Sequence, residues 1–96
     1  MNKQLLVSII MPNYNSAATL DEAVKSVLAQ DYTLWELVII DDQSSDKSLE
    51  ISEAYALIDP RISVLRTGRN VGSGAARNLG INSSKGELIA FLDSDD

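Results

Sequence analysis

The sequence of 96 residues contains neither cysteine nor histidine. Their absence excludes disulfide bonds, thiol catalysis, imidazole general bases and the usual zinc ligands, so any metal ion must be held by oxygen atoms. Basic residues are also scarce, with 8 Lys and Arg against 14 Asp and Glu. The resulting net charge of −6 disfavours nucleic acid or an anionic membrane surface as a partner.

Long hydrophobic runs are also missing. The first apolar stretch, residues 5–11, is followed at once by Pro12 and Asn13, with no small-residue cleavage site. We therefore expect a cytoplasmic protein, with peripheral membrane association left open for a longer form. The hydrophobic content of 45% is ordinary for a globular fold, and the length predicts one domain over residues 1–96.

Short apolar segments alternate with amphipathic ones along the chain. Branched apolar residues predict buried strands at residues 5–11, 35–40, 62–65 and 87–92. Helical spacing predicts helices near residues 20–30 and 75–82, and a second helix whose apolar stripe is Ile51, Ala54, Tyr55 and Ile58. Thr19 begins a capping-box spacing at the first helix, and Gly86 can supply a left-handed cap after the third.

This alternation predicts a doubly wound α/β fold. The expected sheet is mostly parallel and Rossmann-like, with helices on both faces and strand order 3-2-1-4 from right-handed crossovers. Ligands of such sheets bind beyond the carboxyl ends of the strands. The polar clusters of this chain follow those ends: residues 13–15, 41–42, 69–70 and 93–96.

The last of these clusters has the pattern of a metal site. Asp93 and Asp95 project the same way if strand geometry persists, which places two hard oxygen ligands side by side. Mg²⁺ or Mn²⁺ takes one or two protein carboxylates and completes its shell with water and substrate phosphate. A solvated acidic tail is the alternative interpretation of an isolated motif of this kind.

Two common phosphate-binding motifs are absent. The first strand is followed by Pro12-Asn13-Tyr14-Asn15, so the glycine-rich dinucleotide fingerprint is missing there, and no P-loop occurs. The glycines in residues 72–74 are interpreted as loop residues, although the helix that follows them could face a diphosphate.

Four ordered motifs together resemble the nucleotide-binding half of a family 2 glycosyltransferase of the GT-A fold. They cover nearly the whole chain and comprise residues 7–15, residues 41–46, residues 70–72 with 76–80, and the Asp-Ser-Asp-Asp of residues 93–96. Gln43 departs from the pattern, because the family more often has glycine or another small residue there.

The resemblance implies a role for particular residues. The nucleotide-binding residues would be Pro12, Tyr14, Asn15, Asp41, Arg77 and Asp93. Tyr14 would lie against the nucleobase and Asp41 would accept a hydrogen bond from it, while Arg77 would touch the diphosphate or pair with a local carboxylate. Asp95, with Asp93, would bind Mn²⁺ or Mg²⁺ that neutralises charge on the departing nucleoside diphosphate.

The implied activity is transfer of a sugar from a nucleotide-sugar donor to a saccharide or lipid-linked acceptor in polysaccharide biosynthesis. A UDP-sugar is the donor that we expect first. No residue is a credible general base, so the catalytic base is expected outside this chain, which looks truncated before the acceptor-binding half. A sugar-nucleotide-forming nucleotidyltransferase and a non-catalytic nucleotide-binding module remain alternatives.

Asp42, Ser44 and Asp46 are interpreted as turn and cap residues. The fourth strand is expected at a sheet edge, where it could mediate self-association.

Overall fold

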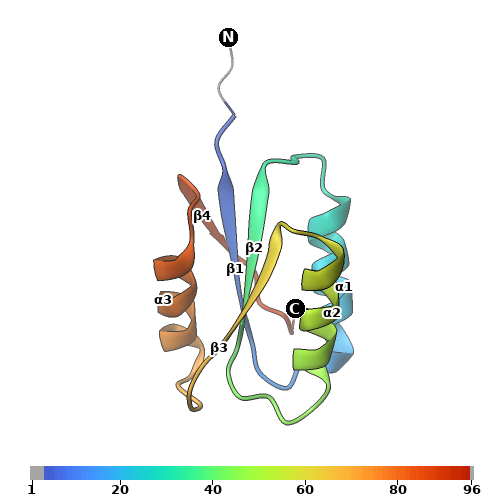
Figure 1. Cartoon of the computed structure of the whole chain (residues 1–96), viewed down its shortest axis with the longest axis vertical. Helices are drawn as coiled ribbons and strands as arrows, with labels where there is room; N and C mark the ends of the chain where they lie inside the picture. The colour runs from blue at the N-terminus through green and yellow to red at the C-terminus, as the bar shows by residue number, and fades with distance from the viewer. Residues whose placement is uncertain (1–3, 96) are drawn as a thin grey trace.

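Strands and helices alternate along the chain in the predicted order (Figure 1). The computed structural model describes residues 4–95. The elements are β1 (Val7–Asn13), α1 (Ala17–Ala29), β2 (Trp35–Asp41), α2 (Ser48–Ile58), β3 (Ile62–Arg66), α3 (Ser73–Ser83) and β4 (Leu88–Phe91).

The strands form one parallel sheet in the order β3-β2-β1-β4, which confirms the predicted topology. The register pairs Asn13 with Asp41, and Asp41 with Arg66. Because all strands run the same way, the segments that follow them meet at one edge of the sheet, which is where the polar clusters of the sequence lie.

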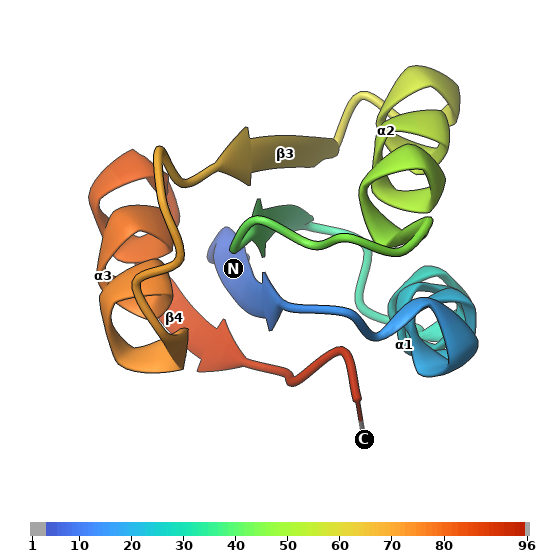
Figure 2. The same cartoon turned by 90° about the horizontal axis from the view of Figure 1, so that it is seen from below.

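Helices cover both faces of the sheet, as predicted. Figure 2 shows α3 on one side and α1 with α2 on the other. Alternation along β1 divides the core accordingly: Ile9 and Met11 pack with α1, whereas Ile10 packs with Ala76 of α3. Gly80 lets α3 approach closely, since a Cβ there would lie 2.7 Å from side-chain atoms of both Ile10 and Ile40.

β1 extends two residues past its predicted end, through Pro12 to Asn13. In a parallel strand, the N–H and C=O of one residue point to the same neighbour. Ile10 accepts from Leu92 on the β4 side, so Pro12 faces that side too, and its carbonyl accepts from Ser94 Oγ at 3.2 Å. The missing N–H of proline therefore falls where the β1–β4 pairing has already ended at Phe91, and the strand tolerates it.

The two predicted caps are wrong. Helix α1 begins at Ala17, whose N–H donates to the Asp46 carboxylate at 3.0 Å. This external acceptor lets the helix start before Thr19, which then lies in the first turn. Gly86 is not a left-handed cap, because Gly72 is the glycine with positive φ among residues 4–95. A Cβ on Gly86 would instead lie 2.7 Å from the backbone nitrogen of Ser8, so glycine permits close approach of the chain to β1.

The buried face of α2 differs from the predicted stripe. Ile51 and Tyr55 pack on the core, but Ala54 is exposed and Ile58 is 78% exposed. The remaining buried positions are the serines at 48 and 52, and Ser52 Oγ donates to the carbonyl of Ser48. The buried face of α2 therefore includes small serines whose hydroxyls are hydrogen-bonded, and the spacing of apolar residues alone does not indicate this face.

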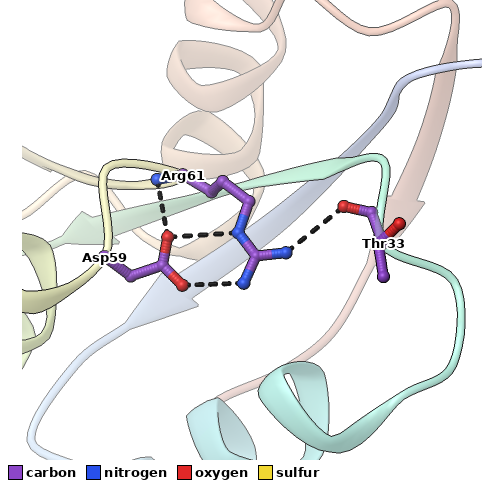
Figure 3. A network of polar contacts seen from close by, with 3 residues as sticks. All are labelled: Thr33, Asp59 and Arg61. Atoms are coloured by element: carbon purple, nitrogen blue, oxygen red, sulfur yellow. Dashed lines mark hydrogen bonds and ion pairs between the residues drawn. The ribbon is translucent and has the colours of Figure 1, made fainter.

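A network of polar contacts among Thr33, Asp59 and Arg61 lies at the amino end of the sheet (Figure 3). Arg61 pairs with Asp59 at 2.8 Å, donates to the carbonyl of Thr33 at 3.2 Å, and stacks 3.8 Å from the centroid of the Trp35 ring. The hydrogen bonds from Arg61 outweigh the effect of burial and hold the pKa of Asp59 below its usual range. These contacts join the starts of β2 and β3.

β4 is one of the two edge strands of the sheet, and its apolar side chains are exposed. The side chains of Leu88, Ile89 and Phe91 are 49%, 40% and 54% exposed, as expected for the edge position that the sequence predicts. Within residues 4–95, no helix is long and apolar enough to cross a bilayer.

Candidate functional site

A solvent-open cavity of about 260 Å³ lies at the carboxyl edge of the sheet. It is lined by Pro12, Asn13, Tyr14, Ser16, Asp42, Ser73, Arg77, Asp93, Ser94 and Asp95. These residues end β1, follow β1, β2 and β4, or lie in α3, so segments far apart in the sequence converge on one place, as doubly wound topology predicts.

Five of the predicted site residues meet at this cavity. They are Pro12, Tyr14, Arg77, Asp93 and Asp95. The Tyr14 side chain is 53% exposed, so its ring presents a free surface beside the buried end of β1. An exposed aromatic face, a guanidinium and two carboxylates together offer stacking, anion binding and hard-cation binding.

Two predicted nucleotide-binding residues are not brought to the cavity. Asp41 is fully buried; its Oδ1 accepts from Asn13 Nδ2 at 3.0 Å and its Oδ2 from the Ser44 N–H at 3.1 Å. Asn15 points to the turn after β2, where its Oδ1 accepts from the Ser45 N–H at 2.7 Å. Both side chains therefore organise loops, and Asp42 takes the place at the cavity predicted for Asp41.

Asp42 is a buried latch for the loop between β3 and α3, which corrects its interpretation as a turn residue. Its Oδ1 accepts from Thr67 Oγ1 at 2.9 Å and the Val71 N–H at 2.8 Å, and its Oδ2 from the Gly72 N–H at 2.8 Å. Burial raises the pKa of Asp42, but these hydrogen bonds outweigh it and bring the pKa below the usual range. The latch places the start of α3, and with it Arg77, beside the cavity.

The turn between Asp42 and α2 explains the departure at position 43. Gln43 has φ of 62°, in the left-handed region that glycine adopts without strain. Its side chain donates to the carbonyl of Thr67, a contact that glycine cannot make. The N-cap position of α2 is Lys47, and Asp46 immediately before it accepts from the Ser48 N–H at 2.9 Å in the first turn of the helix. Ser44 braces the loop after β1 by accepting from the Asn15 N–H at 3.0 Å.

Asp93 and Asp95 both line the cavity, as their spacing predicts, while Ser94 between them is buried. Ser94 Oγ donates to Asn13 Oδ1 at 2.9 Å, and the Ser94 carbonyl accepts from Thr19 Oγ1 at 2.7 Å. The peptide between the two carboxylates is thus fastened to β1 on one side and to α1 on the other.

The two carboxylates differ in their surroundings. Asp93 Oδ1 accepts from Arg77 Nη2 at 3.1 Å, and both side chains remain partly exposed. Asp95 is exposed at the cavity rim. Within residues 4–95, no three His, Cys, Asp or Glu side chains gather into a group that could hold a metal. Two carboxylates fit Mg²⁺ or Mn²⁺ that keeps water and phosphate ligands, and they do not form an all-protein cage.

Comparison with known proteins decides the family. A family model described as "Glycosyl transferase family 2" matches residues 8–96. The chain belongs to glycosyl transferase family 2. The chain is also 46% identical, over 95 residues, to the Escherichia coli UDP-Glc:alpha-D-GlcNAc-diphosphoundecaprenol beta-1,3-glucosyltransferase WfgD, covering 95% of this chain and 35% of that protein.

Solved structures of TarS and of a mannosyltransferase share the fold. S. aureus TarS 1-349 in complex with UDP-GlcNAc superposes with a TM-score of 0.84 at 34% identity, covering 93% of this chain and 26% of that one. The mannosyltransferase PcManGT from Pyrobaculum calidifontis, in complex with GDP-Man and Mn²⁺, gives 0.88 at 25% identity, covering 97% and 28%. The α/β sheet is therefore that of GT-A glycosyltransferases. The chain spans about a third of the length of the first curated relatives that it matches.

Sequence reasoning missed two residues with clear structural roles at the site. Ser94 carried no signal beyond its place between two aspartates. Asp42 carried one: alternation along β2 puts Val38 and Ile40 on the α3 face, so the next residue of that series, Asp42, points toward the loop that leads into α3.

Proposed function

We propose that the cavity binds the nucleoside diphosphate of a sugar-nucleotide donor together with a divalent cation, Mn²⁺ or Mg²⁺. The observation that supports this most directly is the convergence of Tyr14, Arg77, Asp93 and Asp95 on one open cavity at the carboxyl edge of the sheet. About 260 Å³ is slightly less than the roughly 300–1,000 Å³ of ligand pockets, which suits the nucleotide part of a donor better than a whole donor.

The side chains divide the ligand into three parts. Tyr14 stacks on the nucleobase, and Asp42, which keeps acceptor capacity at the cavity, receives a hydrogen bond from it. Arg77 faces the diphosphate, where its present pairing with Asp93 gives way to phosphate oxygens. Asp95, with Asp93, holds the cation, which supplies charge neutralisation for the leaving nucleoside diphosphate.

We infer UDP as the preferred nucleotide. The relatives whose names carry UDP-Glc and UDP-GlcNAc are 46% and 34% identical to this chain, whereas the structure with GDP-Man is 25% identical. A uracil ring offers an N–H donor to a carboxylate such as Asp42. By analogy with WfgD, whose name contains a diphosphoundecaprenol, the acceptor is a lipid-linked saccharide.

Calorimetry with UDP tests the proposal. Binding of UDP in Mn²⁺ is expected to be clearly tighter than in EDTA, and Asp95→Asn should remove most of that difference because it deletes a ligand charge at constant volume. Equal affinity in Mn²⁺ and EDTA would eliminate the metal. Asp42→Asn should weaken UDP far more than pyrophosphate, by about 1.5–3 kcal/mol for a hydrogen bond to a charged group. Equal losses for both ligands would assign Asp42 to the loop alone.

A further inference from the structure

Three buried polar side chains form a chain across the strand ends beneath the cavity. Asp41, Asn13 and Ser94 are 0%, 1% and 2% exposed. They come from β2, from β1 and from the segment after β4, so this series of side chains runs across neighbouring strands of the sheet. We call these three residues the strand-end relay. Asn13 and Ser94 are among the residues that line the cavity, and Asp41 is not.

The carboxylate sets the direction of every hydrogen bond in the relay. A carboxylate can only accept, so Asn13 must turn its Nδ2 toward Asp41, at 3.0 Å. The amide oxygen of Asn13 then faces the other way, where it accepts from Ser94 Oγ at 2.9 Å. The hydroxyl hydrogen of Ser94 is thereby committed inward, shared between Asn13 and the carbonyl of Pro12.

The relay ends between the two carboxylates of the cavity. Ser94 points inward, so Asp93 and Asp95 on either side of it point outward. The carbonyl of Ser94 is held from the opposite direction by Thr19 Oγ1 at 2.7 Å. Rotation of the Ser94 peptide would break the buried hydrogen bond to Asn13 and the partly buried one from Thr19, so the outward direction of the carboxylates depends on the relay.

We propose that Asp41 and Asn13 are positioning residues that act through Ser94 to fix the direction in which Asp93 and Asp95 face the cavity. This inference rests on the proposed binding of a nucleoside diphosphate with a divalent cation. It assigns Asp41 a role remote from the ligand, and it gives a function to a fully buried carboxylate on β2, which is separated from β4 by β1. Groups that orient a metal ligand typically change metal affinity by about 10- to 100-fold.

The test compares UDP affinity in Mn²⁺ with UDP affinity in EDTA. In Asp41→Asn, the new side-chain amide has one oxygen and one NH₂ group in place of two oxygens. It can therefore no longer accept from Asn13 Nδ2 and from the Ser44 N–H through separate oxygens. The ratio of the two affinities is expected to fall about tenfold, while affinity in EDTA stays nearly unchanged. Ser94→Ala should give the same loss, and the double variant should lose little more than either single one, because the residues act in series.

Asp59→Asn is the matched control. It removes a carboxylate that pairs with Arg61 at the opposite end of the sheet, so it lowers stability without reaching the relay. Its affinity ratio should equal that of the unaltered chain. Additive losses from Asp41→Asn and Ser94→Ala, or equal losses in Mn²⁺ and EDTA, would overturn the proposal. If Asp41→Asn does not fold, an unchanged ratio in folded Ser94→Ala overturns it as well.

Amide NMR signals of the ligand-free chain separate this inference from the proposed function. Asp41→Asn should shift the signals of Asp93 and Asp95, while Asp59→Asn should leave them in place. Shifted signals with no effect of Mn²⁺ on the unaltered chain would leave the positioning intact and refute the metal site. Unshifted signals in folded Asp41→Asn would refute the positioning whatever the chain binds.

Discussion

The two ends of the sheet use buried polar groups in different ways. At the amino end, Arg61 meets Asp59, the carbonyl of Thr33 and the ring of Trp35, and the network closes on itself. At the carboxyl end, Asn13, Asp41, Asp42 and Ser94 form a buried layer, above which Tyr14, Arg77, Asp93 and Asp95 line an open cavity. Every buried side-chain nitrogen and oxygen in residues 4–95 has a hydrogen-bond partner, so both ends are satisfied.

The difference indicates where this fold places its function. At the amino end, the polar groups join the starts of two strands, and none of the side chains that line the cavity depends on them. The carboxyl end has a supporting layer whose members each hold a loop that carries a cavity residue: Asp42 holds the segment leading to Arg77, and Ser94 holds Asp93 and Asp95. Substitutions at the two ends should therefore have distinguishable consequences.

Removing the Asp42 latch should have the largest effect on stability. Asp42→Ala leaves the buried hydroxyl of Thr67 and the partly buried hydrogen bonds of the Val71 and Gly72 N–H groups without their acceptor, and we expect a loss of roughly 2–4 kcal/mol in the free energy of unfolding. Asp59→Ala should cost about 1 kcal/mol, because the partly exposed Arg61 can turn to water. Urea denaturation measures both, and equal losses would contradict the contrast between the two ends.

Close approach of the chain to β1 should be the next most sensitive feature. In Gly86→Ala, the new methyl group would lie 2.7 Å from Ser8 N and 2.8 Å from the carbonyl oxygen of Leu6, so β4 must move away from β1. Overpacking of this kind costs about 1–3 kcal/mol. Gly74→Ala is the control, since nothing lies within 4 Å of its Cβ position, and in helix α3 it should stabilise by about 0.5–1 kcal/mol. Unchanged stability of Gly86→Ala would contradict the close approach of this residue to β1.

Acid should weaken both ends, with a different salt dependence at each. The pKa values of Asp42 and Asp59 lie below the ordinary value of 3.8, so each carboxylate contributes stability above that pH, and the contribution is lost as the pH falls through the folded-state pKa. The partners of Asp42 are neutral donors on a carboxylate that is itself buried, whereas Asp59 faces the charged and partly exposed Arg61. High salt should therefore reduce the contribution of Asp59 and leave that of Asp42.

Urea denaturation of Asp42→Asn and Asp59→Asn between pH 3 and pH 7 provides the measurement. The stability difference between each variant and the unaltered chain should shrink below about pH 4. At 1 M salt, the Asp59 difference at neutral pH should be smaller, while the Asp42 difference should persist. A salt-sensitive Asp42 difference would mean that its carboxylate is accessible to solvent.

The sequence predicted the fold well because hydrophobic periodicity and crossover handedness both depend on short-range rules. It located strand ends less well: β1 continues through Pro12 because pairing with β4 stops earlier, a fact about another strand. The acceptor for the N–H of Ala17, the first residue of α1, is Asp46, which lies in a different loop. Such features depend on neighbours that are distant in sequence, so local patterns cannot reveal them.

At the site, most of the residues that the motifs single out line the cavity, while Asp41 and Asn15 lie in the loops around it. Tyr14, Arg77, Asp93 and Asp95 were predicted and line the cavity. Asp41 was assigned to the ligand, although it follows Leu37 and Ile39 on the face that packs with α1. Two adjacent aspartates after a buried strand must point to opposite faces, and only the positions of the flanking helices decide which one reaches the ligand.

The smallest expected effect is self-association through the edge strand β4, whose apolar side chains are more exposed than those of β1 and β2. Leu88, Ile89 and Phe91 are exposed on β4, and an unpaired apolar edge is a template for another strand. We predict weak self-association of the chain through antiparallel pairing of β4 with the same strand of a second copy, which a two-fold axis permits. The net charge of −6 on each copy opposes contact, so association should strengthen when salt screens that repulsion.

Sedimentation over a range of chain and salt concentrations tests this prediction. The average mass should rise with concentration, more steeply at 0.5 M salt than at 0.05 M. Ile89→Lys should abolish the rise, because it places a long charged side chain on the edge strand, whereas Leu57→Lys, at a side chain that is 90% exposed on α2, should not. Hydrogen exchange adds a second readout: the β4 amides should become better protected as the concentration increases. A concentration-independent monomer with well-protected β4 amides would show that this edge is stable without a partner strand.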